Sequence, residues 1–141
     1  MLGWLYGHVF EYIAHKHVLH NRRRFKKSFI NHFKTHHNMS RKNNMYDENY
    51  NKIISSKFEL YSLSFILFLH SPVFIIFPYF YFMIMWSIFI YYYLHRLSHL
   101  NTIWGKKWLP WHYEHHMGKN QNINWGVRLP IIDKLLGTSK Y

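Results

Sequence analysis

The longest pattern in the chain is an apolar block at residues 60–95 that contains no Asp, Glu, Lys or Arg. It exceeds the roughly 20 residues that one membrane span needs and has the length of two short spans. Pro72 and Pro78 lie near its middle, where a chain can turn. The pattern predicts a helical hairpin over about 57–101, whose first arm ends just before Pro72. At ~1.5 Å per residue that arm is short for a hydrocarbon core of ~30 Å.

Basic residues flank this block on both sides. Eleven of the 18 Lys and Arg lie between residues 16 and 57, and the other seven lie from residue 96 onward. An excess of Lys and Arg beside membrane spans is typical of cytoplasmic segments, so both flanks are expected on the cytoplasmic side. Anionic lipid headgroups account for the net charge of +12, and no nucleic-acid partner is expected.

The first half of the chain predicts one helix and one loop before the hairpin. A helix is expected over residues 1 to about 20, and Gly3 and Gly7 would let another helix approach it closely. The polar, asparagine-rich tract at 38–51 has no apolar period and predicts a loop. Ser56-Lys-Phe-Glu59 fits a capping box, which predicts a helix start just before the apolar block.

The second half predicts two breaks after the hairpin. Gly105 is expected to end the second arm. Pro110 is favoured at the first position of a helix, and Gly118 would stop that helix after about two turns. The remaining residues predict a loop and a short final turn.

Histidine is the most informative residue type in this sequence. Ten of the 13 histidines fall into four sets at 15–20, 32–37, 95–99 and 112–116, and the i, i+3 and i+4 spacings of the last two sets place their rings on a shared helical face. The ten are His15, His20, His32, His36, His37, His95, His99, His112, His115 and His116. Neutral imidazole is the commonest metal ligand among side chains, and one tetrahedral site uses only four ligands. Ten candidates therefore predict two metal ions.

The hairpin explains how four distant sets could meet. It returns the third set to the side from which the chain entered the membrane, so all four are expected at one membrane surface. His8 and His70 stand apart from the sets and are not expected to bind metal. Glu11 lies four residues before His15, on the same helical face, and is a candidate to accept the other N–H of that ring. The sequence has no cysteine, which excludes thiolate ligands and disulfides.

These residues resemble the fatty acid hydroxylase superfamily, which includes sterol desaturases and carotenoid hydroxylases. The resemblance rests on the ordered boxes H-x4-H, H-x3-HH, H-x3-H and H-x2-HH, and on the tail at 124–138. Many members space the second box H-x2-HH, and here Phe33 adds one residue to it. The resemblance covers nearly the whole chain and implies a single domain over 1–141.

The resemblance implies an all-α integral membrane protein with a transmembrane hairpin and a cytosolic, histidine-rich dimetal cap. It implies a non-haem di-iron oxygenase that hydroxylates a lipid, an acyl chain first of all, with O2 as co-substrate. Zinc has no redox chemistry, so iron is the expected functional metal even if zinc occupies a recombinant protein. Electrons would come from a partner such as a b-type cytochrome or a ferredoxin, because the sequence has neither a dinucleotide fingerprint nor cysteines for an iron–sulfur cluster.

Three alternatives stay open at this stage. The phrase at 14–20 also looks like the first box of carotenoid hydroxylases, so a carotenoid or sterol could be the substrate, and desaturation begins with the same hydrogen abstraction. A non-catalytic membrane protein that stores, senses or carries metal is the second. A family member that keeps its metal site only for stability is the third. Transport is disfavoured because, among polar metal-binding groups, only His70 interrupts the apolar block before its final residue.

Overall fold

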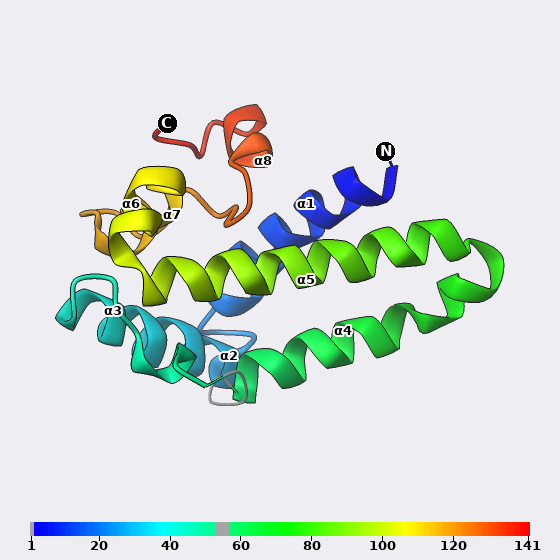
Figure 1. Ribbon diagram of the computed structural model, residues 1–141, viewed down its shortest axis with the longest axis horizontal. Helices are drawn as coiled ribbons and strands as arrows, with labels where there is room; N and C mark the ends of the chain where they lie inside the picture. Colours follow the sequence, from blue (N-terminus) through cyan, green and yellow to red (C-terminus); the bar gives the residue numbers. More distant parts are fainter. Residues whose placement is uncertain (1, 53–56) are drawn as a thin grey trace.

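The computed structural model describes residues 2–52 and 57–141, and this part of the chain is helical with no β-strand. Three long helices lie side by side, and shorter helices gather at one of their ends (Figure 1). In chain order the elements are α1 (Leu2–Ala14), η1 (His15–Leu19), α2 (Lys26–Phe29), η2 (Ile30–His37), α3 (Asn38–Lys42), η3 (Glu48–Tyr50), α4 (Lys57–Ile76), α5 (Pro78–Leu100), α6 (Thr102–Trp108), α7 (Pro110–Met117) and α8 (Ile131–Leu135).

Helix α1 packs closely on α5 through its two glycines. A Cβ atom on Gly3 would lie 2.7 Å from Cβ of Met83, and one on Gly7 would lie 2.5 Å from Oγ of Ser87. Neither distance leaves room for a side chain, so the two backbones approach only because these residues are glycine. The predicted close approach of a second helix is confirmed.

Helices α4 and α5 run antiparallel and meet at Phe77 (Figure 1). The prediction that the first arm ends before Pro72 is wrong, because Pro72 lies inside α4. The chain turns instead at Phe77, whose φ of −133° and ψ of 69° leave the helical region immediately before Pro78. Pro78 then occupies the favoured first turn of α5. With 20 residues, α4 is about 30 Å long, which matches a hydrocarbon core.

The segments that flank the hairpin differ from the sequence predictions at two boundaries. The helix through η2 continues as α3 to Lys42, so the predicted loop at 38–51 begins later, where Asn44 and Met45 adopt positive φ. Gly105 does not end the second arm. Helix α5 stops at Leu100, and Gly105 lies within α6, where an added Cβ would meet the Ser98 carbonyl oxygen at 2.7 Å.

The sequence also predicts the two ends of α7 and the start of α4. Pro110 begins α7 and Gly118 caps it, as predicted. Ser56 of the predicted capping box lies outside the described residues. Glu59, its other member, uses its carboxylate for contacts with Tyr50 and His95.

One helix of the described chain, α4, is long and apolar enough to cross a membrane, with a mean hydropathy of 1.6. Large apolar side chains are also exposed on α1 and α5, away from the end where the short helices gather. Examples are Leu5 of α1, Phe68 and Ile75 of α4, and Phe89 of α5. A concentration of exposed apolar side chains on a few helices is typical of contact with lipid or with another protein. The location of the hairpin across a bilayer stays a prediction.

Candidate metal centre

All ten histidines of the four sets lie in one cluster where α5 ends and the short helices gather. Nine are buried, with no more than 8% of each residue exposed, and His20 is half-buried. Among the described residues, nine of these histidines form two groups, and within each group the nitrogen atoms offered as ligands all lie within 4.8 Å of one another. Group A is His15, His20, His32, His37 and His115, and group B is His36, His95, His99 and His116.

The two groups are adjacent because two helices supply ligands to both. His36 and His37 are consecutive on η2, and His115 and His116 are consecutive on α7. Consecutive helical side chains point about 100° apart, so each pair divides between the groups. The ring centroids of His37 and His116 are only 4.0 Å apart. His112 belongs to neither group, although its Nε2 lies 3.3 Å from Nε2 of His99 in group B.

Group A is built on π-helical turns. Its pairs His15/His20 and His32/His37 are each five residues apart, and on an α-helix such residues point about 140° away from each other. Segments η1 and η2 are π-helices, whose i→i+5 hydrogen bonds bring these positions toward one face, as the 3.2 Å bond from His20 N to His15 O shows. The wider turn of η2 also accommodates Phe33, the additional residue of the second box.

Five of the histidines are fixed through Nδ1. The rings of His15, His99 and His115 donate to backbone carbonyls of Trp125, Met45 and Ile123 at 2.6, 2.7 and 2.7 Å. Two others donate to carboxylates: His36 to Asp47 at 2.7 Å and His95 to Glu59 at 2.8 Å. In a neutral imidazole, a protonated Nδ1 leaves Nε2 with a free lone pair. A metal-binding histidine is commonly held in this way.

Asp47 and Glu59 were not identified from the sequence. Asp47 lies in the loop before η3, and Glu59 lies in the first turn of α4, where it also accepts a hydrogen bond from Tyr50 at 2.7 Å and one from Tyr91. A signal was available, since only six acidic residues occur in a chain with a net charge of +12. An acid retained in such a composition is a candidate for a specific buried partner.

Glu11 does not hold His15, so that prediction is wrong. Its carboxylate accepts from the Arg128 side chain at 2.6 Å and from the backbone N–H of Val127 at 2.5 Å. The Trp125 carbonyl takes the place expected for Glu11 beside His15. A charged guanidinium competes better for a buried carboxylate than a neutral ring does.

The tail after α7 is anchored so that its carbonyls reach the histidines. Asp133 accepts hydrogen bonds from the backbone N–H groups of Trp125 and Gly126, both at 2.8 Å, and from the hydroxyl of Thr138 at 2.7 Å. Glu11 binds the next two N–H groups. These bonds fix the loop that presents Trp125 O to His15.

Burial and the charges of neighbouring rings lower the pKa values of several histidines in the cluster. The pKa falls to about 3 for His20 and to about 4 for His115, with burial the larger cause in both. Burial also lowers the pKa of His36, although hydrogen bonding to Asp47 partly offsets this. The rings whose pKa is lowered in this way, His20, His36 and His115 among them, are therefore neutral near pH 7, which is the form that binds metal.

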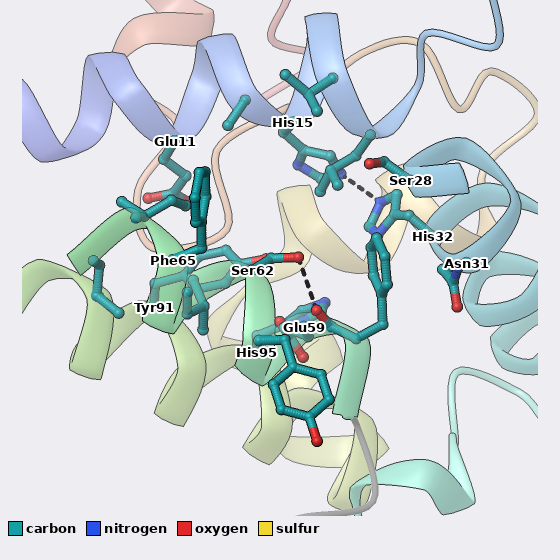
Figure 2. A pocket seen from close by; sticks show the side chains of 18 of the residues that line it. Glu11, His15, Ser28, Asn31, His32, Glu59, Ser62, Phe65, Tyr91 and His95 are labelled. Atoms are coloured by element: carbon teal, nitrogen blue, oxygen red, sulfur yellow. Dashed lines mark hydrogen bonds and ion pairs between the residues drawn. The ribbon is translucent and has the colours of Figure 1, made fainter. Parts of the chain in front are cut away.

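The donor set fits a pair of metal ions. Nε2 atoms of His36, His95 and His115 are buried without a hydrogen-bond partner. Nε2 of His15 lies 2.9 Å from Nε2 of His32, and the two nitrogens point toward each other (Figure 2). Buried polar atoms normally have partners, so inward-facing lone pairs without donors call for a cation between them. Group A offers five nitrogens, one more than a structural zinc site uses.

His8 and His70 lie outside both groups. His8 is buried beside Trp4. His70 lies in α4, where it contacts Tyr6.

A cavity of about 990 Å³ opens onto the histidine cluster. Its lining includes His15 and His32 of group A, His36 and His95 of group B, and apolar side chains of α1, α4 and α5. Figure 2 shows Phe65 and Tyr91 on one side of this space and Ser28 and Asn31 near His32 on the other. Its size is at the upper end of the ~300–1,000 Å³ range of small-molecule sites.

Comparison with known proteins agrees with the geometry of this centre. The family model described as "Fatty acid hydroxylase" matches residues 1–138. No curated protein and no solved structure matches the chain. The family consists of membrane-associated hydroxylases and desaturases, and it covers all four histidine sets and the tail. The chain therefore belongs to the fatty acid hydroxylase family.

Proposed function

We propose that this protein is a membrane-bound di-iron oxygenase that hydroxylates the acyl chain of a lipid. The observation that carries the proposal is the cavity between α1, α4 and α5, because it places an apolar chamber directly against both histidine groups. Groups A and B would each hold one iron, and His112 would complete the surroundings of group B. When bound, the two irons would supply the reductive activation of O2 that attack on an unactivated C–H bond requires.

The protein's own residues would position the metals and the substrate. Asp47 and Glu59 keep the imidazoles of His36 and His95 in the tautomer whose Nε2 faces inward. Hydrogen bonds from Tyr50 and Tyr91 in turn hold Glu59. Apolar side chains around the cavity exclude water from the reacting carbon.

The position of the protein in the membrane and the side from which it is reduced follow from the same arrangement of helices and histidines. The exposed apolar surface of α1, α4 and α5 would lie in lipid, with the histidine cluster at the cytoplasmic face, where the basic flanks meet anionic headgroups. A separate electron donor, such as a b-type cytochrome or a ferredoxin, would reduce the centre from that side. The shape of the cavity, elongated along three helices, favours a single acyl chain over a rigid ring system.

The test is oxygen-dependent formation of a hydroxylated lipid by purified protein in lipid nanodiscs, loaded with iron and supplied with reductant. His99→Ala and His115→Ala should each lower turnover at least 10–100-fold, the usual effect of losing even a supporting contact of a metal ligand. The control Lys42→Ala changes an exposed residue and should be nearly neutral. Full turnover by His115→Ala, or equal activity with zinc, would refute the proposal in favour of a non-catalytic metal protein.

A further inference from the structure

The cavity is a trough with a definite length. Helices α1 and α4 each pack mainly on α5, so α5 forms the floor and the other two form the walls. At the histidine end the lining includes Glu59 and His95, and at the other end it includes Tyr6, His70 and Ile84. Glu59 and His70 are eleven residues apart on α4, and Ile84 and His95 are eleven apart on α5, so the trough extends ~16 Å from the metal centre.

A hydrogen bond crosses the trough at its far end. Nδ1 of His70 donates to the Ile66 carbonyl at 2.7 Å, so Nε2 is the acceptor for the Tyr6 hydroxyl, also at 2.7 Å. Tyr6 also contacts Phe80 of α5, with ring centroids 5.4 Å apart, and Phe10 packs edge-on against His70 at 5.6 Å. This bridge therefore joins both walls of the trough to its floor.

His70 is a polar residue in the apolar helix α4, so its presence there calls for a physical explanation. Placing a polar side chain in a membrane-facing segment costs free energy unless it is hydrogen-bonded, and an apolar residue at this position would avoid that cost. The hydrogen-bonded imidazole and phenol, whose rings meet edge-on at an interplanar angle of 67°, form a more rigid barrier than a flexible aliphatic side chain would. Because Nε2 and Nδ1 of His70 are both engaged, the bridge offers no free donor on the imidazole and suits the methyl end of a chain.

The opposite end of the cavity suits a polar headgroup. Lys27, Ser28, Asn31 and Lys57 line it there, close to the histidines. Ser28 and Asn31 lie beside His32 and away from Phe65 (Figure 2). A lipid with an anionic headgroup at this end would extend its chain past the metal centre toward Tyr6 and His70.

We infer that the Tyr6–His70 bridge sets the longest acyl chain that the protein accepts, by closing the trough ~16 Å from the metal centre. The inference rests on the proposed function, since it assigns the substrate chain of the same site. At ~1.3 Å per methylene, which follows from a C–C bond of ~1.5 Å, the trough holds about twelve methylenes beyond the metal centre. Longer chains meet the bridge and are rejected by steric overlap, as in an overpacked core.

Selectivity here arises from fit rather than from hydrophobic transfer. A chain in the bilayer is already out of water, so an additional methylene gains little by entering the trough. A chain that is too short leaves a void, and one that is too long forces side chains from their rotamers. Discrimination of roughly tenfold against a chain that overfills the trough by two methylenes is the expected scale.

The experiment presents the full-length protein in nanodiscs with an equimolar mixture of saturated fatty acids of increasing length. Bound chains are identified by native mass spectrometry of the metal-loaded protein without reductant, and hydroxylated products are identified separately after reductant and O2 are added. His70→Ala shortens the barrier by ~3 Å and should move the optimum of both profiles about two methylenes longer. Tyr6→Phe removes only the hydroxyl and should shift the profiles in the same direction by less.

Tyr81→Phe is the matched control. Tyr81 also donates to α4 from within the hairpin, to the Leu67 carbonyl at 3.3 Å, but it does not line the cavity. Its loss should leave both profiles unchanged. If His70→Ala does not fold, Tyr6→Phe alone decides, because it keeps the ring and its packing.

The two readouts separate the inference from the proposed function. A shifted binding profile in a protein that forms no product would uphold the bridge as the chain-length limit and refute the oxygenase. Turnover with unchanged binding and product profiles in His70→Ala and Tyr6→Phe would uphold the oxygenase and refute the bridge. An equal shift in Tyr81→Phe would also overturn the inference, because the effect would then come from general loosening of the hairpin.

Discussion

Asp47→Asn should release one metal ion and leave the other in place. The two carboxylate oxygens of Asp47 have different partners. Oδ2 accepts from Nδ1 of His36 at 2.7 Å, and Oδ1 accepts from the backbone and side-chain nitrogens of Asn49 at 3.0 and 2.9 Å. An asparagine has one carbonyl oxygen. If that oxygen keeps both bonds to Asn49, its NH2 group faces the N–H of His36, donor against donor.

The magnitude follows from what His36 must do to relieve this conflict. Its ring can move the proton to Nε2, which removes the lone pair that faces group B. Losing the partner of a metal-bound histidine typically costs 10–100-fold in metal affinity, or about 1.4–2.8 kcal/mol. A hydrogen bond to a charged group contributes about 1.5–3 kcal/mol, which agrees with that range. Asp47 bonds to His36 of group B and to no described histidine of group A, so group A should keep its affinity for metal.

The assay is metal content per chain during titration with a chelator, on protein purified with its metals. Wild type should lose its two metals at high chelator concentration, and Asp47→Asn should lose one of them at a concentration 10–100-fold lower. Glu48→Gln is the control, since it removes the adjacent carboxylate, which is exposed and has no contact with a histidine. If Asp47→Asn keeps both metals as tightly as the wild type does, the role given to His36 is refuted. If it loses both metals at the same lower chelator concentration, the separation into two groups is refuted.

Three further predictions concern pH, packing and topology. The metal-free protein should lose stability as pH falls from about 6.5 to about 4. In that range the unfolded chain binds protons at histidines such as His115, whose pKa in the folded protein is lowered to about 4, and thermal unfolding at a series of pH values would measure the loss. Gly7→Ala should destabilise by about 1–3 kcal/mol, because the new Cβ would lie 2.5 Å from Oγ of Ser87, and unfolding in detergent should show a lower midpoint. Single cysteines at Lys42 and Lys140 should react with an impermeant reagent from the same side of sealed vesicles, and opposite sides would refute the hairpin topology.

The parts of the fold that the sequence predicts are those set by composition over long windows. The absence of charge over residues 60–95 predicts the long apolar helices that the structure shows as α4 and α5. The four histidine sets select ten residues, nine of which fall into groups A and B, and their role as metal ligands stays a prediction. Pro72 misled because proline in an apolar helix is tolerated where neighbouring groups satisfy the freed carbonyl. Within the hairpin only Pro78 follows a helix end, because Phe77 before it leaves the helical region. Both prolines lie inside the same apolar block, so composition does not show which of them ends a helix.

The supporting contacts could not be predicted because they depend on the packing of distant segments. Glu11 has the helical spacing expected of a partner for His15, but Arg128, more than a hundred residues later, takes its carboxylate. His15 instead donates to a backbone carbonyl. Every residue carries such an acceptor, so the residue type does not show which carbonyl will be used. Asp47 and Glu59 were detectable only as rare acids in a basic chain.

The π-helices explain why the spacing of the histidines identifies the clusters but does not predict the backbone geometry of group A. A box whose histidines are five residues apart points them to different faces of an α-helix, so group A cannot form on regular α-helical geometry. The convergence of His15 with His20, and of His32 with His37, requires each backbone to take the wider turn. A π-helix is rare because its hydrogen bonds are less favourable, and it persists where surrounding contacts hold it. Here those contacts are the bond from His15 to Trp125 and that from His36 to Asp47, so the ligands and the segments that position them stabilise one another.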